Sequence, residues 1–526
     1  MSVAGHHGRH APEKSMRRVG LLIAIALATL MLAGVGPRTL DANGLATAGQ
    51  DQRVEVEPQL RRQMDADGAV GYLIYLRDRP DLSAASAMDW NERGRFVVEA
   101  LQQTAGRSQA AVIDYLDKQD ASYRSYWIDN VILVESSSRA AFDGLAQFPQ
   151  IGSLRARRTM ALIEPTKGVA VLSPTAIEPN ISHVRTDQVW GLGHDGDGIV
   201  VANIDTGVRY THETLQPQYR GSLGGGSFSH HHNWLGAVDG AAVPTDDHGH
   251  GSHTMGTMIG DDGGINQIGM APGAQWIACD GCSSTGCPDA ALLECAQWVA
   301  APYPIGDPNS PDPDKRPHVV NNSWGDCGTS YDDWYQTVVD NWHAAGIYPV
   351  FSNGNSSNCS YSYPPGLNTV GNPARYGNVT GVGSTGQSDG QYATHSNWGP
   401  TDNPDTVNPR GHADLKPQVL APGVNIRSSL QSSDAEYGSW AGTSMSAPHV
   451  AGLVALMWQA APCLVGDYAG TETVIEETAT AIPYDDGTGG GAHVPNYAAG
   501  WGEIDALAAV QGAIALCGNS TLAGRV

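Results

Sequence analysis

The segment TDDHGHGSHTMGTMIG, residues 245–260, places three histidines behind two aspartates. His248, His250 and His253 could hold a metal ion, or one of the imidazoles could act as a catalytic base. A base of this kind needs a nucleophile to deprotonate and a carboxylate to orient it. The histidine spacing alone does not separate the two interpretations, so the partners must be sought elsewhere in the chain.

Two further segments carry residue types that would complete a nucleophilic site. Asp205 ends the strand-like run GIVVANID, and Ser444 lies where a glycine-rich loop meets the helical run SAPHVAGLVALMWQAAP. A serine hydroxyl is a weak nucleophile, which an imidazole oriented by a carboxylate can activate. The Asn355 side chain and the Ser444 backbone N–H, which lies at a helix start, would be two donors for an oxyanion.

Alternating strands and helices must position these residues. Apolar runs typical of buried strands occupy residues 198–205, 318–325, 346–355 and 378–385, and runs with helical spacing occupy 290–302, 334–346 and 446–462. This alternation favours an α/β fold, a mainly parallel sheet with helices on both faces. Because function collects at the carboxyl ends of parallel strands, Asp205, His250 and Ser444 can meet there.

A smaller α+β unit precedes this part of the chain. The patterns predict a strand in AVGYLIYL, a helix over 93–119, a strand over 125–136, a short helix over 138–150 and a final strand over 151–163. Such a unit, about 100 residues long, is within the usual size of one domain. The segment 164–180 is proline-rich and lacks periodicity, which predicts a linker.

The composition also indicates a globular protein of more than one unit. The chain has 526 residues, 41% of them hydrophobic, and a net charge of −24. A nucleic-acid partner is not expected, because phosphate binding needs clustered Lys and Arg. Residues 41–170 carry 15 basic and 18 acidic side chains, whereas residues 171–526 carry 10 and 35. This difference predicts two units with different roles.

The N-terminus and the cysteines both indicate export. Lys14, Arg17 and Arg18 precede the apolar run 19–36, and Ala46–Ala48 provide a small-x-small cleavage site. An uncleaved membrane anchor is the alternative. All eight cysteines follow residue 278, and export favours disulfides. The alternative is a zinc knuckle that uses Cys279, Cys282, Cys287 and Cys295.

Five motifs in order now resemble those of a known family. ANIDTGV, HGHGSHTMG, VVNNSWG, SNGN and GTSMSAPHVAG resemble the signature blocks of the subtilisin-like serine proteases, and the order Asp, His, Ser is theirs. The resemblance covers roughly residues 180–515. Longer phrases such as NQIGMAPGAQWIA and APGVNIRSS look most like the bacillopeptidase F branch.

The resemblance implies a role for each matching residue. Asp205, His250 and Ser444 become a catalytic triad, and Asn355 with the Ser444 N–H an oxyanion hole. Two segments would bind the substrate as an added strand and line its specificity pocket, through Ser323, Trp324, Gly325, Ser352, Asn353 and Gly354. The implied activity is a serine endopeptidase that forms an acyl-enzyme. No cofactor is expected in catalysis, whereas many members bind structural calcium.

The resemblance also explains the first unit. Residues 70–163 resemble the propeptides that act as intramolecular chaperones and inhibitors of subtilases. The implied plan is a signal peptide at 1–48, a propeptide domain at 49–163, a linker with the processing site at 164–180 and a catalytic domain at 181–526. We expect a secreted, self-processing zymogen, monomeric, with protein or peptide substrates and its own propeptide as partners.

Three features depart from the family pattern. Ser352 and Asn353 stand where relatives carry small apolar residues, and Trp324 is bulky beside the same cleft. No calcium-binding loop of the relatives can be matched. The cysteine pattern also differs from that of the Bacillus members, and we expect the pairs Cys279–Cys295, Cys327–Cys359 and Cys463–Cys517.

Alternative interpretations remain at this stage. His248, His250 and His253, with the triple histidine at 230–232, could bind catalytic zinc, although no HExxH motif occurs. GQSDG matches a nucleophile elbow centred on Ser388, but a polar, proline-containing loop follows it instead of a helix. A third alternative is a catalytically inactive subtilase fold that serves as a secreted binding protein.

Overall fold

The computed structural model describes residues 53–168, 176–403 and 410–523. The chain from Arg53 onward forms one compact unit. The predicted signal peptide and its apolar run lie outside the described residues. Within the described ranges, no helix is both long enough and apolar enough to cross a bilayer.

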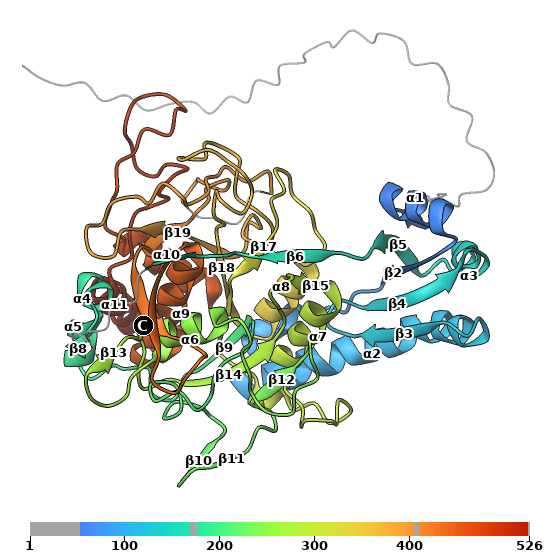
Figure 1. Cartoon of the computed structure of the whole chain (residues 1–526), viewed down its shortest axis with the longest axis horizontal. Helices are drawn as coiled ribbons and strands as arrows, with labels where there is room; N and C mark the ends of the chain where they lie inside the picture. The colour runs from blue at the N-terminus through green and yellow to red at the C-terminus, as the bar shows by residue number, and fades with distance from the viewer. Residues whose placement is uncertain (1–52, 169–175, 404–409, 524–526) are drawn as a thin grey trace, which may run out of the picture. The chain divides into compact units, whose positions relative to one another are not determined.

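Short strands alternate with helices along most of the chain (Figure 1). The strands are β1 (Glu55–Val56), β2 (Ala69–Leu76), β3 (Ser122–Tyr126), β4 (Val131–Ser138), β5 (Ile151–Ala156), β6 (Thr159–Leu162), β7 (Thr166–Lys167), β8 (Ala176–Ile177), β9 (Val200–Asp205), β10 (Ser222–Gly224), β11 (Ser227–Phe228), β12 (Trp234–Gly236), β13 (Asn266–Gln267), β14 (Gln275–Asp280), β15 (Cys287–Pro288), β16 (Val319–Asn322), β17 (Trp324–Gly325), β18 (Tyr348–Ser352), β19 (Thr380–Thr385), β20 (Val419–Pro422), β21 (Ile426–Ser429) and β22 (Tyr437–Ala441). The α-helices are α1 (Pro58–Asp67), α2 (Trp90–Lys118), α3 (Arg139–Gly144), α4 (Pro179–His183), α5 (Thr186–Gly191), α6 (His250–Ile259), α7 (Asp289–Ala300), α8 (Gln336–Ala344), α9 (Thr443–Ala460), α10 (Tyr468–Thr478) and α11 (Ala506–Ala523).

The central sheet has seven strands in the order β12-β14-β9-β16-β18-β19-β20. Every adjacent pair is parallel. The predicted α/β class, a parallel sheet with helices on both faces, is therefore confirmed. After β9, the chain forms β12 and β14 on one side of β9 and then β16 on its other side. The carboxyl end of β9 therefore lies at a switch point of the sheet.

Each face of the sheet has its own apolar core. Val201 of β9 and Val319 of β16 pack with residues of α6, α9 and α11. The next residues, Ala202 and Val320, pack with residues of α7 and α8 on the other side. This alternation follows from the two-residue period of a strand, and burial on both faces explains the continuous apolar runs in the sequence.

The N-terminal domain contains a five-stranded sheet in the order β1-β5-β2-β4-β3. The predicted strand over 125–136 is wrong, because the chain turns within it and forms the antiparallel pair β3 and β4. Asn130 closes this turn in a left-handed conformation with φ of 48°, which asparagine tolerates. The apolar residues on both sides of the turn concealed the break.

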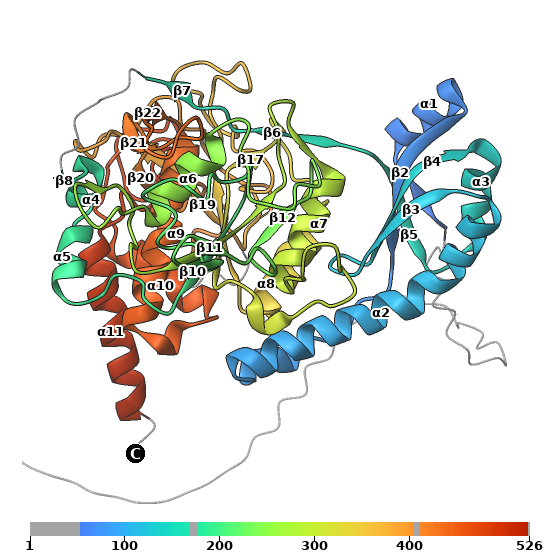
Figure 2. The ribbon, with the colours of Figure 1, turned by 60° about the horizontal axis from the view of Figure 1, so that its bottom comes forward.

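The predicted strand over 151–163 also divides into two. β5 stays in the sheet of the N-terminal domain, whereas β6 pairs with β15 and β17 of the α/β part. Figures 1 and 2 show β6 extending from one part of the unit to the other. The segment predicted as a linker contains two short strands, because β7 pairs with β22 and β8 pairs with β13.

The cysteines form disulfides. The three expected pairs, Cys279–Cys295, Cys327–Cys359 and Cys463–Cys517, are present. A fourth, Cys282–Cys287, joins the remaining two. The zinc knuckle is therefore excluded, since all four of its proposed ligands are engaged in disulfides.

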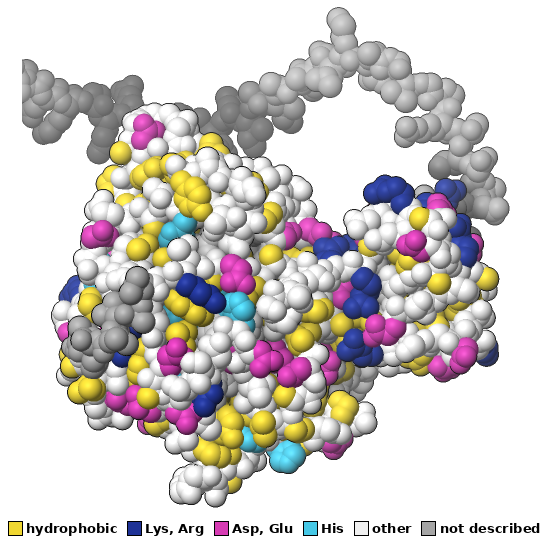
Figure 3. Space-filling model, viewed as in Figure 1, with side chains coloured by type: hydrophobic (Ala, Val, Ile, Leu, Met, Phe, Trp, Pro, Cys, Tyr) yellow, Lys and Arg dark blue, Asp and Glu magenta, His cyan; other side chains and the backbone are white. Residues whose placement is uncertain are grey.

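The uneven charge of the sequence is visible on the surface. On the face shown in Figure 3, Lys and Arg side chains gather over the N-terminal domain, where acidic side chains lie among them, whereas acidic side chains predominate over the remainder. Ion pairs join the two parts, including Arg158 with Asp332 at 2.7 Å and Arg157 with Asp289 at 2.7 Å. At these two points, arginines that follow β5 thus face carboxylates of the α/β part.

Candidate active site

Asp205 lies at the carboxyl end of β9, as expected. Its side chain is buried, and its Oδ1 accepts a hydrogen bond from the Thr206 backbone N–H at 2.8 Å. The hydroxyl of Thr254, from α6, donates to Oδ2 at 3.5 Å. These contacts fix the orientation of a carboxylate that has little access to water.

His250 opens helix α6 and faces Asp205. Its Nδ1–H donates to Asp205 Oδ1 at 2.7 Å. Burial alone would lower the pKa of His250, but the charge of Asp205 and the hydrogen bond to it outweigh burial and raise the pKa above its usual value. A Cβ on Gly251 would lie 2.0 Å from the Gly207 carbonyl oxygen, so glycine lets the start of α6 approach the loop after β9 this closely.

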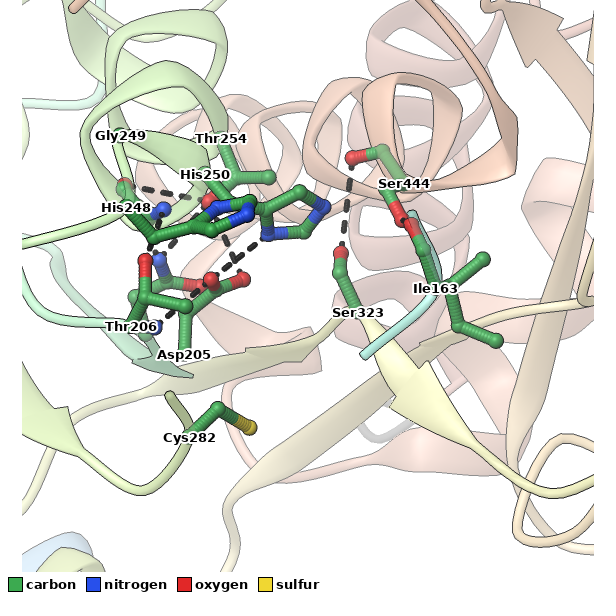
Figure 4. Close-up of polar contacts among 12 residues, drawn as sticks. Ile163, Asp205, Thr206, His248, Gly249, His250, Thr254, Cys282, Ser323 and Ser444 are labelled. Carbon is green, nitrogen blue, oxygen red and sulfur yellow. Dashed lines mark hydrogen bonds and ion pairs between the residues drawn. The ribbon is translucent and has the colours of Figure 1, made fainter. Parts of the chain in front are cut away.

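Ser444 is the second residue of α9 and is fully buried. Figure 4 shows the imidazole of His250 between the Asp205 carboxylate and the Ser444 side chain. Nε2 of His250 is buried and has no hydrogen-bond partner among the described residues. The Ser444 hydroxyl instead donates to the Ile163 carbonyl oxygen at 2.7 Å. The structure therefore brings the three residues together while a backbone carbonyl holds the serine proton.

Asn355 follows β18 and reaches the same place. Its Oδ1 accepts from the Thr443 N–H at 2.9 Å, which orients the amide, and its Nδ2 donates to the Glu164 carbonyl oxygen at 3.1 Å. The Ser444 N–H belongs to the first turn of α9, where backbone donors have no partner within the helix. The Asn355 amide therefore contacts the segment that crosses the site, and the Ser444 N–H lies at the helix start next to it.

That crossing segment is the chain's own residues 159–168. β6 lies between β15 and β17 and pairs antiparallel with both. The Ile163 N–H donates to the Ser323 carbonyl oxygen at 3.3 Å, which continues the pairing up to the nucleophile. Beyond it, β7 pairs with β22, directly before Gly442. The segment thus occupies the site on both sides of Ser444.

The substrate-binding residues predicted from the resemblance have mixed positions. The backbones of Ser323, Trp324 and Gly325 pair with residues 161–163 of the chain's own crossing segment. The prediction of Trp324 as bulk beside the cleft needs correction: its side chain is fully buried and packs edge-on against Tyr335 and Phe351.

The second group, Ser352, Asn353 and Gly354, is buried. The Asn353 amide donates to the Asn397 carbonyl oxygen, and the Gly354 N–H donates to the Thr443 hydroxyl at 3.2 Å. Gly354 has a φ of 100°, in the region that favours glycine. These contacts support the turn that carries Asn355.

The three histidines of the motif point to different partners. His248 Nε2 lies 3.2 Å from Glu164 Oε1, and His253 Nε2 donates to the Ile426 carbonyl oxygen at 3.0 Å. Burial lowers the pKa of His253 to about 3, so it remains neutral. No group of three or more His, Cys, Asp or Glu side chains in the described ranges is arranged to hold a metal. The geometry does not support the zinc interpretation.

The triple histidine at 230–232 and Ser388 are the residues that the remaining zinc and nucleophile-elbow alternatives need. His230, His231 and His232 each contact a different partner: Tyr219, Ile305 and Pro302. Ser388 lies in a bend after β19, and the described residues that follow it, up to Asn403, contain no helix. The nucleophile-elbow interpretation therefore lacks the helix that it requires.

Sequence reasoning missed Asp246, which organises the loop before α6. Its Oδ1 accepts from the Thr206 hydroxyl and from the His248 and Gly249 N–H groups, and its Oδ2 accepts from Ser252. An aspartate four residues before His250 at a helix start was the available signal. Its partners come from two segments, so only the tertiary structure reveals the network.

Comparisons with known proteins agree with this geometry. Residues 196–502 match the Subtilase family. Bacillopeptidase F of Bacillus subtilis (strain 168) is 37% identical over 445 residues, which cover 82% of this chain and 29% of that protein. Subtilisin DY of Bacillus licheniformis is 31% identical over 282 residues, which cover 53% of this chain and 84% of the relative.

One solved structure shares the fold. The crystal structure of fervidolysin from Fervidobacterium pennivorans, a keratinolytic enzyme related to subtilisin, matches with a TM-score of 0.56. The alignment has 19% identity and covers 87% of this chain and 63% of that one. At this identity the match shows the fold alone.

Proposed function

The chain belongs to the subtilase family, and on that premise we propose that it is a serine endopeptidase made as a self-processing zymogen. The alignment spans under a third of bacillopeptidase F, so the proposed activity rests on this chain's own site. The observation that carries the proposal is the meeting of Asp205, His250 and Ser444 around the chain's own backbone. An inactive binding protein finds no support, because every group that the chemistry needs is present.

In the proposed mechanism, Ser444 attacks a peptide carbonyl while His250 Nε2 accepts its proton. Asp205 holds Nδ1–H, which leaves Nε2 as the basic nitrogen, and stabilises the imidazolium that forms. The Asn355 amide and the Ser444 N–H stabilise the oxyanion. His250 then gives its proton to the leaving amine, and water hydrolyses the acyl-enzyme through the same groups.

The N-terminal domain acts as the inhibitor in this proposal. β6 fills the place of a substrate strand, so external peptides cannot pair with β15 and β17 while it is bound. The expected propeptide, 49–163, ends where this pairing ends. Because the domain is joined covalently to the site, its effective concentration there is high, and release requires cleavage.

The bond proposed to be cleaved is Ile163–Glu164. The Ser444 hydroxyl donates a hydrogen bond to the Ile163 carbonyl oxygen. The Ile163 N–H, which donates to the Ser323 carbonyl oxygen, makes the last backbone contact of the strand on this side of the site. Glu164–Pro165 is the alternative, because Asn355 contacts the Glu164 carbonyl. The nucleophile favours the first bond.

Export, and removal of residues 1–48 as a signal peptide, belong to the same proposal and agree with the four disulfides.

Intact masses of the secreted wild type and Ser444→Ala test the proposal. We expect a wild-type product that begins at Glu164, hydrolyses casein and is labelled on Ser444 by phenylmethylsulfonyl fluoride. Ser444→Ala should keep residues up to Ile163, since it lacks the nucleophile. Equal masses with no label and no casein hydrolysis would refute the peptidase. A product that begins at Pro165 would refute only the assigned bond.

A further inference from the structure

A small cavity lies beside the catalytic carboxylate. Its volume is about 130 Å³, and its lining includes Thr206, Asp239, Asp247, His248, Asp280 and Cys282. Liquid water occupies about 30 Å³ per molecule, so the cavity has room for the end of a long side chain. Thr206 and His248 flank two residues of the proposed triad, which places the cavity directly at the site.

Asp280 is the unusual member of this lining. It ends β14 in register with Asp205 on β9, and it is only 6% exposed. No described residue donates a hydrogen bond to its carboxylate, whereas buried carboxylates are normally paired or hydrogen-bonded. Burial, and then the charges of Asp239, Asp246, Asp247 and Asp205, raise the pKa of Asp280 to about 8. The carboxylate therefore lacks the positive partner that its surroundings favour.

The position of the cavity along the bound strand can be read from β6. Cys282 to Ser284, on one side, precede β15, whose Cys287 pairs with Met160. His248, on the other side, contacts Glu164. Between these two points Ala161 is exposed, whereas Leu162 is buried in the same apolar cluster as Cys282. Ile163, the third residue between them, is also buried but lies against Gly325 of β17. That leaves Leu162, the second residue before the proposed cleaved bond, on the side of the strand that faces Cys282.

We propose that this cavity binds a lysine or arginine side chain of the substrate, carried by the second residue before the cleaved bond. The proposal rests on the peptidase function above and adds a substrate class to it. An ammonium or guanidinium group would pair with Asp280, with Asp247 and Asp239 nearby, and its methylene stem would lie along the apolar surface that Leu162 covers in the zymogen.

A bound metal ion explains the cavity less well. In the described ranges, no three side chains of the types that bind metals are arranged around one point. A substrate side chain needs fewer partners in the cavity than a metal ion does, because the peptide backbone that carries it is itself bound along the strand. Cationic side chains are also attracted by the surrounding field, since the residues from 171 onward carry 10 basic and 35 acidic side chains.

Two peptides test the proposal on the processed enzyme at pH 8.5. They are identical except for lysine or norleucine at the second position before the cleaved bond, and mass spectrometry verifies where each is cut. We expect kcat/KM to be about 10-fold higher or more for lysine, as charge-assisted hydrogen bonds predict. Asp280→Asn should reduce this ratio toward one.

Asp197→Asn is the matched control. Asp197 is exposed and precedes β9, so the substitution removes the same charge at the opposite edge of the sheet, where the strands begin. It should leave the lysine-to-norleucine ratio unchanged. A ratio near one in the unsubstituted enzyme, or an Asp280→Asn variant with the original ratio, overturns the cationic pocket even though the norleucine peptide is hydrolysed.

Failure of the peptidase itself has a different signature. Neither peptide would then be cut, and fluorescence anisotropy of the same labelled peptides would measure binding to the protein. Tighter binding of the lysine peptide that is lost in Asp280→Asn would support the pocket alone. Equal affinities would overturn it.

Discussion

At the residue scale, the site depends on an imidazole held between a buried carboxylate and a serine. Burial and charge act on His250 in opposite directions, and the 2.7 Å contact with Asp205 decides the outcome. The pKa of His250 is therefore raised. Because a general base must be neutral, activity should increase with pH through this raised value.

Asp205→Asn tests this balance. Removing the charge leaves burial as the main influence on His250, so the acidic limb of the kcat/KM profile should move to lower pH. Turnover should also fall by about 10⁴-fold, because an amide does not stabilise the imidazolium. The pH dependence of peptide hydrolysis for both proteins is the measurement. An unmoved acidic limb would contradict the role given to Asp205.

At the scale of elements, disulfides connect helices and loops to the sheet. Cys463–Cys517 spans 54 residues and ties α11 to the turn after α9. α11 packs on α9 and α5, and Cys463 follows the end of α9 that is opposite to Ser444. Closure of so long a loop reduces the entropy of the unfolded chain considerably.

The double variant Cys463→Ser, Cys517→Ser should therefore be less stable by about 4 kcal/mol in the loop-entropy estimate. The midpoint of denaturation of the Ser444→Ala precursor, which does not digest itself, measures this. Reductant should lower the midpoint of the precursor that retains this pair more than that of the double variant. Equal midpoints for the two precursors would show that α11 does not need the bond.

At the scale of the whole molecule, the N-terminal domain and the α/β part bury a carboxylate between them. Asp129 lies in the turn between β3 and β4 and is 1% exposed. The neighbouring Ile128 carbonyl accepts from Asn341 of α8 at 2.6 Å. Burial raises the pKa of Asp129 to about 7, and Arg79, 3.6 Å away, offsets only part of this effect.

This burial predicts that the unprocessed chain is less stable at higher pH. The folded pKa of Asp129 is higher than that of an unfolded aspartate, about 3.9, so stability is lost as pH rises from about 4 to 7. Asp129→Asn in the Ser444→Ala precursor should raise the melting temperature at pH 8 and change it little at pH 4. Thermal melts at both pH values measure the effect, and a gain that is equal at both would contradict it.

Much of the site was determined by the sequence itself. Asp205 ends an apolar run, His250 and Ser444 begin helices, and a parallel sheet brings strand ends and helix starts to one edge. Local patterns of this kind are readable because they reflect periodicity and helix-terminus chemistry. Three disulfide pairs were also expected correctly, although the cysteine pattern departs from that of the Bacillus members.

The tertiary structure decided what depends on contacts between distant segments. The fold divides residues 151–163 between two sheets and brings the Ile163 carbonyl to the Ser444 hydroxyl. It also places Asp280 beside Asp205, where the Asp280 carboxylate has no hydrogen-bond donor among the described residues. No local pattern contains this information, because a strand's partner and a carboxylate's desolvation depend on what packs against them. The sequence therefore determined which chemical groups form the site, whereas only the fold decided which segment of backbone lies against them.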